Sequence, residues 1–124
     1  MLFSKGGKIM EKQFHIGDVL SVTTKRQVSP RDMEGIRGIL FFLMGSMLDD
    51  MQIFQAKNLC KSHVLELHPQ LQGVDASGVT SANYQEWIDQ QIGRFGEYLA
   101  ICPIPKDHQK RREILNSGII VLTV

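Results

Sequence analysis

The chain has 124 residues, a formal net charge of +1, 43% hydrophobic residues and 22% charged residues. This composition is ordinary for a globular protein and not for a disordered or fibrous one, and the small net charge argues against a general binder of nucleic acids or membrane surfaces. The longest uncharged run, residues 38–48, is far shorter than the roughly 18 residues that a membrane-spanning helix needs. Two cysteines without a CxxC spacing, Cys60 and Cys102, indicate reduced thiols in a cytoplasmic protein.

Residues 1–9 are expected to lie outside the folded domain. Lys5 to Met10 can be encoded by a purine-rich stretch containing AGGAGG shortly before an ATG codon, which is the pattern of a bacterial ribosome-binding site. We therefore predict that the native protein starts at Met10 and that residues 10–124 form a single globular domain encoded by a bacterial or phage gene. Mass spectrometry of the protein from its natural host would refute this prediction if the chain began at Met1.

Residues 14–24 are predicted to form the first strand. Ile16, Val22 and Thr23 are β-branched, and the apolar residues of this stretch alternate well enough for a strand. Gly17-Asp18 indicates a bulge or turn near its start.

The helix predicted after this strand is the most apolar in the chain. Ser29 is a suitable N-cap, Pro30 suits the first helical position, and Gly45 suits the C-cap. Gly35 and Gly38 each cost about 1 kcal/mol relative to alanine inside a helix, which indicates that another element approaches closely there. The apolar stripe of this helix consists of Met33, Ile36, Leu40, Leu43 and Met47.

The remaining elements are predicted from the spacing of their apolar residues and from the glycine, proline and capping residues at their ends. Apolar residues recur at positions 53, 56, 60, 64 and 67, a helical spacing that stops before His68-Pro69. In chain order we predict a helix over residues 51–67, a loop over 70–80, a helix capped by Thr80 or Ser81 and closed by Gly96, a short strand over 97–105, a charged helix over 106–116 and a buried strand over 119–124.

These elements predict an α+β or small α/β domain with about three strands and four helices. The order is β, α, α, α, β, α, β, with a three-stranded sheet covered by helices on one face. The last strand, helix and strand fit a right-handed parallel crossover, close to the minimum length for such a connection.

The elbow, residues 24–28, is the best candidate for a ligand site. Thr23, Thr24, Lys25 and Arg26 follow the predicted strand, and Ser29 and Arg31 lie at the start of the next helix. Basic side chains beside the free N–H groups of a helix start can bind an anion such as a phosphate. The elbow contains no glycine-rich loop, however, so a plain polar connection that caps the helix remains the alternative.

One basic cluster occurs near the C-terminus. Lys106, Lys110, Arg111 and Arg112 lie on or next to the charged helix. They form either its solvated face or a contact for an acidic partner or nucleic acid. No aromatic residues alternate with these cations, so binding of nucleic acid is the less favoured interpretation.

Metal and catalytic sites have weaker support. Cys60, His63, Glu66 and His68 can each ligate a metal, but their spacing matches no zinc signature, and we expect no metal or cofactor. The adjacent Asp49-Asp50 pair is expected in a turn with its side chains pointing apart, and no nucleophile signature is present. The sequence therefore predicts a binding protein more than an enzyme.

Several blocks of the sequence resemble a family of small uncharacterised proteins encoded by phages and prophages. These blocks are GDVLSVTT, SPRDMEGIRGIL, HPQLQGVDASGV, Trp87 and GRFGEYL, and together they span about Phe14 to Leu99. The resemblance implies a phage or prophage origin and carries no catalytic residue to this chain. Lys25 stands where glycine is expected to be frequent in that family.

Two functions are compatible with these features. The first is a non-enzymatic phage or prophage accessory protein that binds a host macromolecule, for example as an inhibitor of a bacterial defence system, and its expected partner is a host protein. The second is a binder of a nucleotide or another phosphate-bearing small molecule at the elbow. Exposed apolar surface would in addition suit a homodimer.

Overall fold

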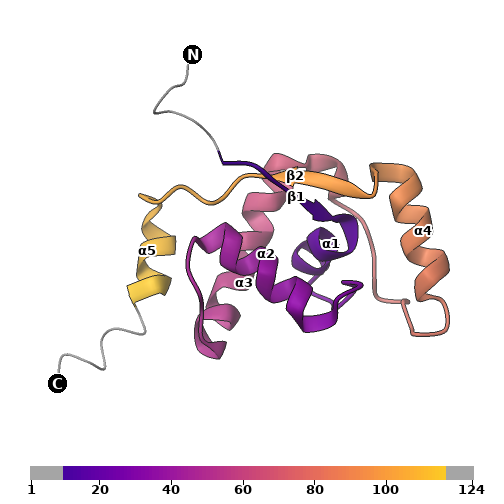
Figure 1. The fold of residues 1–124 in the computed structure, drawn as a ribbon, viewed down its shortest axis with the longest axis horizontal. Helices are drawn as coiled ribbons and strands as arrows, with labels where there is room; N and C mark the ends of the chain where they lie inside the picture. Colours follow the sequence, from indigo (N-terminus) through magenta and orange to yellow (C-terminus); the bar gives the residue numbers. More distant parts are fainter. Residues whose placement is uncertain (1–9, 117–124) are drawn as a thin grey trace, which may run out of the picture.

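The computed structural model describes residues 10–116, which form five α-helices, one short 3₁₀ turn and a two-stranded antiparallel sheet (Figure 1). The α+β prediction therefore holds in its broad form, but within residues 10–116 the strands number two instead of three and the α-helices five instead of four. In chain order the elements are β1 (Lys12–His15), α1 (Ile16–Thr24), α2 (Asp32–Met44), α3 (Asp50–Leu67), η2 (Pro69–Leu71), α4 (Tyr84–Phe95), β2 (Tyr98–Ile101) and α5 (Gln109–Asn116).

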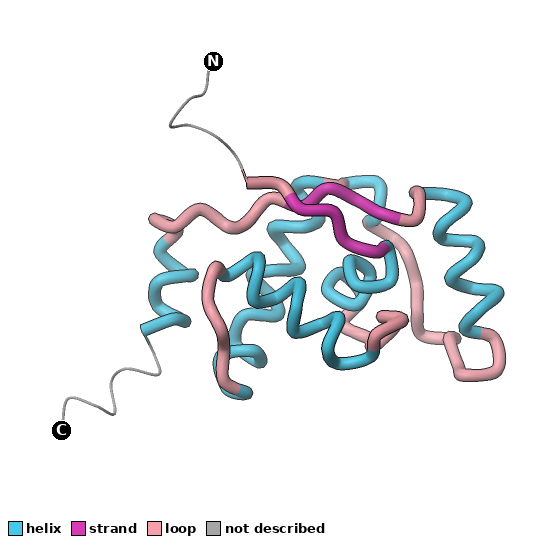
Figure 2. The backbone as a smooth tube through the Cα atoms, in the orientation of Figure 1, coloured by secondary structure: helices cyan, strands magenta, loops and turns pink. Residues whose placement is uncertain are grey.

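The two strands pair in an antiparallel register. Lys12 faces Ile101, and His15 faces Tyr98. Strand β2 lies within the predicted range of residues 97–105, and it pairs with β1 near the start of the described chain. The strands run along one side of the helical body, with α4 at one end of the molecule and α5 at the other (Figure 2). The predicted strand over residues 119–124, and the parallel crossover that it would complete, lie outside the described residues.

The strand predicted over residues 14–24 is wrong for most of its length. Only its first two residues belong to β1, and residues 16–24 form helix α1. Every residue of α1 from Ile16 to Thr23 is buried. The helix therefore has no exposed face, and its sequence lacks the helical alternation of apolar and polar residues that would identify it. Its run of apolar and β-branched residues is typical of a buried strand, and tertiary burial overrides that local preference. The helix begins where the Nδ1 atom of His15 accepts a hydrogen bond from the backbone N–H of Gly17 at 2.9 Å.

Helix α2 confirms the predicted apolar helix but not its predicted start. The helix begins at Asp32, after Arg31, and Ser29 is not its N-cap. Gly45 ends the helix in the left-handed conformation, with φ of 71°, as predicted. Two members of the predicted stripe lie outside the core, since Met33 is 40% exposed and Met47 is 82% exposed.

Helix α3 is the longest element and packs against α1, α2 and α5. It ends at Leu67, as predicted from the His68-Pro69 pair that follows. Its buried face carries Ile53, Ala56, Cys60 and Val64 at the predicted spacing. Its start is fixed by a capping box, in which Asp49 accepts a hydrogen bond from the backbone of Gln52 and the Gln52 side chain accepts one from the backbone of Asp49. The core of the molecule therefore lies where α3 meets α1 and α2.

The last helices complete the body and connect it to the sheet. Helix α4 starts at Tyr84, three residues after the predicted cap, because residues 80–83 form a turn in which the Asn83 side chain accepts a hydrogen bond from the backbone of Thr80. Helix α5 lies within the predicted range. Within residues 10–116, no helix combines the length and the apolar character that crossing a membrane requires.

Candidate functional site

The start of α2 is organised around a buried carboxylate, Asp18 of α1. Asp18 is 1% exposed, and its Oδ1 atom accepts a hydrogen bond from the hydroxyl of Ser29 at 2.5 Å. Its Oδ2 atom accepts one from Nη2 of Arg31 at 3.0 Å, and the two groups form an ion pair. Two residues of the predicted phosphate site, Ser29 and Arg31, therefore bind an anion that belongs to the chain itself.

This network requires Gly35. A Cβ atom at that position would overlap the Ser29 hydroxyl and the Asp18 carboxylate. The close approach predicted from Gly35 is confirmed, and the approaching element is α1 with the segment that follows it. At Gly38 an added Cβ would make only an ordinary contact, 3.7 Å from Nη2 of Arg31, so the same prediction is wrong there.

The elbow folds back along α1 and is held on two sides. The backbone N–H of Val28 donates a hydrogen bond to Oγ of Ser21 at 3.0 Å, and the carbonyl of Val28 accepts one from the Tyr84 hydroxyl at 2.9 Å. Partial burial, together with the negative charges of Asp18 and Asp32, raises the pKa of Tyr84 and keeps its hydroxyl protonated as a donor. The elbow is therefore a fixed part of the structure, clamped between α1 and α4.

The threonines of the predicted site are engaged by the chain, whereas its cations face outward. Thr24 donates a hydrogen bond to the carbonyl of Leu20 at 2.6 Å and accepts one from the backbone N–H of Arg26; Thr23 contacts the same carbonyl at 3.5 Å. Lys25 adopts φ of 61°, the left-handed conformation that glycine favours, and its ammonium group donates a hydrogen bond to Oδ1 of Asn58. The side chains of Lys25 and Arg26 are the exposed cations of the predicted site, and of these two Lys25 is already bonded to Asn58.

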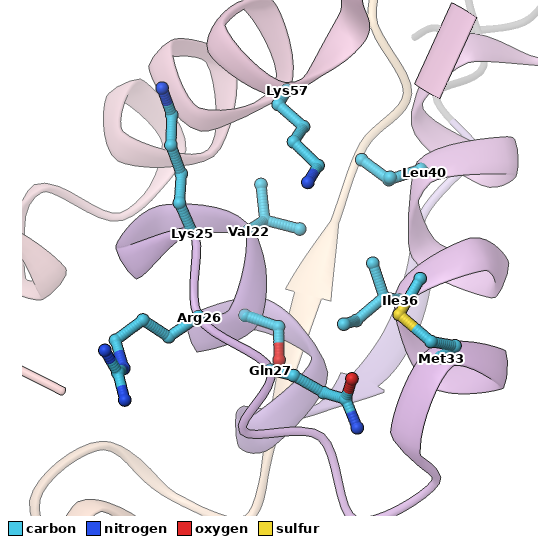
Figure 3. A pocket seen from close by; sticks show the side chains of 9 residues that line it. Val22, Lys25, Arg26, Gln27, Met33, Ile36, Leu40 and Lys57 are labelled. Carbon is cyan, nitrogen blue, oxygen red and sulfur yellow. The ribbon is translucent and has the colours of Figure 1, made fainter. Parts of the chain in front are cut away.

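A cavity of about 220 Å³, here called the elbow pocket, opens beside these cations. Helices α1 and α2 supply apolar walls, and Figure 3 shows Lys57 of α3 reaching toward the space between Val22 and Leu40. Lys57 has no hydrogen-bond or ion-pair partner among residues 10–116. The pocket is lined by Ser21, Val22, Lys25, Arg26, Gln27, Met33, Ile36, Leu40 and Lys57.

This lining combines three cations with an apolar wall and contains no carboxylate. Such a surface suits a ligand with an apolar or aromatic body and an anionic end. The cavity is smaller than the roughly 300 Å³ at which pockets for drug-sized ligands begin, so it has room for one ring system with the charged end outside, beside Arg26. Lys57 could not be found from the sequence, because only the packing of α3 against α1 brings it to the elbow.

The predicted basic cluster does not act as one patch. Arg111 turns inward and donates hydrogen bonds to the carbonyls of Met44 and Lys106, at 2.8 and 3.0 Å. It thereby serves the C-terminal end of α2, where a cation also complements the helix dipole. Lys110 borders a groove between α3 and α5, whereas Lys106 and Arg112 are exposed and line none of the cavities described here.

The candidate metal ligands are used to hold elements together. Nε2 of His63 contacts the carbonyl of Cys102, and Nε2 of His68 contacts the carbonyl of Ala100, both at 2.7 Å, so that α3 is joined to β2 and the segment after it. Burial raises the pKa of Cys60 to about 12, which leaves it an unreactive core thiol. Among residues 10–116, no three His, Cys, Asp or Glu side chains are grouped as a metal site.

Neither the family models, nor the curated proteins, nor the solved structures compared with this chain gave a match.

Proposed function

We propose that the protein binds a small anionic molecule with an apolar or aromatic body in the elbow pocket, and that a nucleotide is the class of ligand that suits it best. The observation that carries this proposal is Lys57, whose ammonium group points toward the space between Val22 and Leu40 without a partner among the described residues. Such an exposed cation can form a charge-assisted hydrogen bond with an anionic ligand.

The two ends of a nucleotide match the two parts of the pocket. The base would lie between Val22 of α1 and Ile36 of α2, and the phosphate would lie on Lys57, which points toward this space in Figure 3. Arg26 lines the rim with its guanidinium directed away from Lys57 in Figure 3, and it would turn to reach the phosphate. Ser29 and Arg31 take no part in this binding, since both are bonded to Asp18. The protein acts by holding or sequestering its ligand, without a catalytic step.

Thermal unfolding of the full chain with AMP, ATP and inorganic phosphate tests this proposal. A ligand at about ten times its Kd stabilises the folded state by about 1.4 kcal/mol, which corresponds to a rise in Tm of about 5 °C for a chain of this size. Arg26→Ala and Lys57→Ala are expected to abolish the rise. Lys61→Ala, one turn further along α3 and outside the pocket lining, is the matched control and retains it.

Met33→Trp gives a second test that leaves the cations in place. Met33 lines the pocket and is 40% exposed, so a larger side chain there would fill the pocket mouth without entering the core. The proposal is wrong if no nucleotide raises the Tm of the wild-type chain, or if the Arg26→Ala and Met33→Trp variants respond as the wild type does.

A second function, binding of a host macromolecule, is favoured by a different observation. Met51 and Phe54, in the first turns of α3, are 63% and 73% exposed, and Met47, in the segment before this helix, is 82% exposed. Exposed apolar groups on one helix face are typical of interaction surfaces. Together with the resemblance described above, this surface supports a phage or prophage accessory protein that acts in the bacterial cytoplasm on a host protein, for example one of a defence system.

Binding of a purified candidate host protein would test this second function. The wild-type chain is expected to bind it, and Phe54→Ser is expected to weaken the complex at least tenfold, as loss of an exposed aromatic anchor does. Equal affinity of the two chains would exclude this surface as the contact.

A further inference from the structure

The outer face of α3 carries a groove that the elbow pocket does not include. The α3–α5 groove has a volume of about 790 Å³, and its apolar part consists of Phe54, Leu59 and Ile114. Phe54 is 73% exposed, and an exposed aromatic side chain is a common feature of interaction surfaces. Met51 lies one turn before Phe54 and extends the apolar surface toward the start of the helix.

Lysines border this groove on two sides. Lys25 and Lys57 lie on the side of α1, and Lys110 lies on the side of α5. The lining contains one carboxylate, Glu113, which is 3.9 Å from the ammonium group of Lys110. The lining therefore carries three lysines against one glutamate, and it combines three apolar side chains with the polar side chains of Gln55, Asn58 and Ser62.

We infer that the α3–α5 groove binds an acidic amphipathic helix of a partner protein. A helix that lies along α3 can place apolar residues at positions i, i+3, i+4 and i+7 against Phe54 and Leu59. Glutamates or aspartates on both flanks of that helix then reach Lys25 on one side and Lys110 on the other. Charge complementarity thus selects an acidic partner, and the apolar side chains of Phe54, Leu59 and Ile114 favour an amphipathic protein helix over a nucleic acid.

This inference rests on the second proposed function and names the chemical class of the partner. It does not depend on the elbow pocket, because Phe54 and Lys110 line the groove alone whereas Arg26 and Met33 line the pocket alone. Loss of nucleotide binding in Arg26→Ala would leave binding of the helix unchanged, so failure of one proposal can be told from failure of the other.

Fluorescence anisotropy with a designed peptide tests the inference on the full chain. The probe is a fluorescein-labelled helical peptide of about 18 residues, with leucine at i, i+3, i+4 and i+7 and glutamate at the flanking positions. A second peptide carries lysine in place of every glutamate, and a third carries serine in place of every leucine. The acidic amphipathic peptide is expected to bind at least roughly tenfold more tightly than either control, and more weakly as the salt concentration rises.

Variants of the protein locate the contact. Phe54→Ser and Lys110→Glu are each expected to weaken binding of the acidic peptide at least roughly tenfold. Arg112→Glu is the matched control, because it makes the same charge change on the same helix outside the groove lining, and it should bind as the wild type does. Since Phe54 and Lys110 are both exposed, these changes leave the core in place.

Five results would overturn the inference. The acidic peptide could bind no better than its controls, or equally well to Phe54→Ser, Lys110→Glu and the wild type. Removal of residues 117–124 could raise peptide affinity tenfold, which would identify the chain's own C-terminal segment as the occupant. Sedimentation could reveal a dimer that Phe54→Ser dissociates, which would identify a second copy. A single-stranded oligonucleotide could bind the groove more tightly than the peptide, which would identify a nucleic acid.

Discussion

Replacing Gly35 by alanine perturbs the contact on which the start of α2 depends. The added Cβ would overlap both the Ser29 hydroxyl and the Asp18 carboxylate, and it would lie 3.1 Å from the Ser29 Cβ. Ser29 is buried and tied to the backbone of Arg31 by a hydrogen bond of 3.0 Å, so it cannot simply turn away. The alanine can be accommodated only if the hydrogen bond between Ser29 and Asp18 breaks and the segment before α2 shifts.

The magnitude follows from three terms. A lost hydrogen bond to a charged group costs about 2 kcal/mol, and the forced shift of a packed segment costs about 2 kcal/mol more. The better helix propensity of alanine offsets about 1 kcal/mol of this loss of stability. We therefore expect Gly35→Ala to lower the free energy of unfolding by about 3 kcal/mol, and the Tm by about 12 °C for a chain of this length.

Urea unfolding followed by circular dichroism measures this effect, and Gly38→Ala is its control. Gly38 lies one turn further along α2, where an added Cβ meets only Nη2 of Arg31 at 3.7 Å. That variant should be about 1 kcal/mol more stable than the wild type, because alanine favours the helix and nothing opposes it. If Gly35→Ala were as stable as Gly38→Ala, the packing of Asp18, Ser29 and Gly35 described here would be refuted.

Three further predictions concern α3 and the two thiols. Asp49→Ala removes the N-terminal cap of α3 and should lower the free energy of unfolding by about 1 kcal/mol; Asp50→Ala, which removes no cap, should change it less in the same urea titration. Burial raises the pKa of Cys60 from about 9 to about 12. The contribution of the protonated thiol to the free energy of unfolding is therefore complete below about pH 9, and it declines above pH 9 by up to about 1.4 kcal/mol per pH unit. A Cys60→Ala variant whose stability declined equally steeply above pH 9 would contradict this prediction. A thiol reagent should label Cys102 alone in the folded chain and both cysteines in urea. Glu11→Gln should speed the labelling of Cys102 in the folded chain, because partial burial and then the charge of Glu11 raise the pKa of Cys102.

The helices that sequence reasoning located are those with one apolar face and clear ends. Helix α3 has a buried stripe and exposed residues on its other faces, and it ends just before a proline. Both its helical period and its end can therefore be predicted from the local sequence. Gly45 marks the end of α2 in the same way. Helix α1 lacks these signals, because it is buried on every side and its side chains follow no period.

The start of α2 illustrates a limit of local reasoning. Ser29 and Pro30 form a convincing cap in the sequence, but the hydroxyl of Ser29 is bound by Asp18, which lies eleven residues earlier. The Ser29 hydroxyl donates to Asp18, and its oxygen accepts a hydrogen bond from the backbone N–H of Arg31, which lies before the first residue of α2. Such a contact could not be predicted while residues 14–24 were interpreted as a strand.

The candidate site was predictable in part for the same reason. The exposed cations of the elbow, Lys25 and Arg26, follow from their place in the sequence, whereas the third cation and the apolar walls of the pocket come from other helices. Lys57 is an ordinary exposed lysine by its local pattern, and only the packing of α3 on α1 gives it a role. Long-range packing therefore supplies the part of the site that distinguishes a pocket from a polar loop.

Native mass spectrometry of the gently purified wild-type chain beside its Arg26→Ala variant tests the elbow pocket most directly. The account predicts an added mass of nucleotide size on the wild-type chain and its loss from the variant, because Arg26 lies at the rim where the phosphate would bind. Bare protein in both spectra, even after addition of excess AMP or ATP, would contradict it.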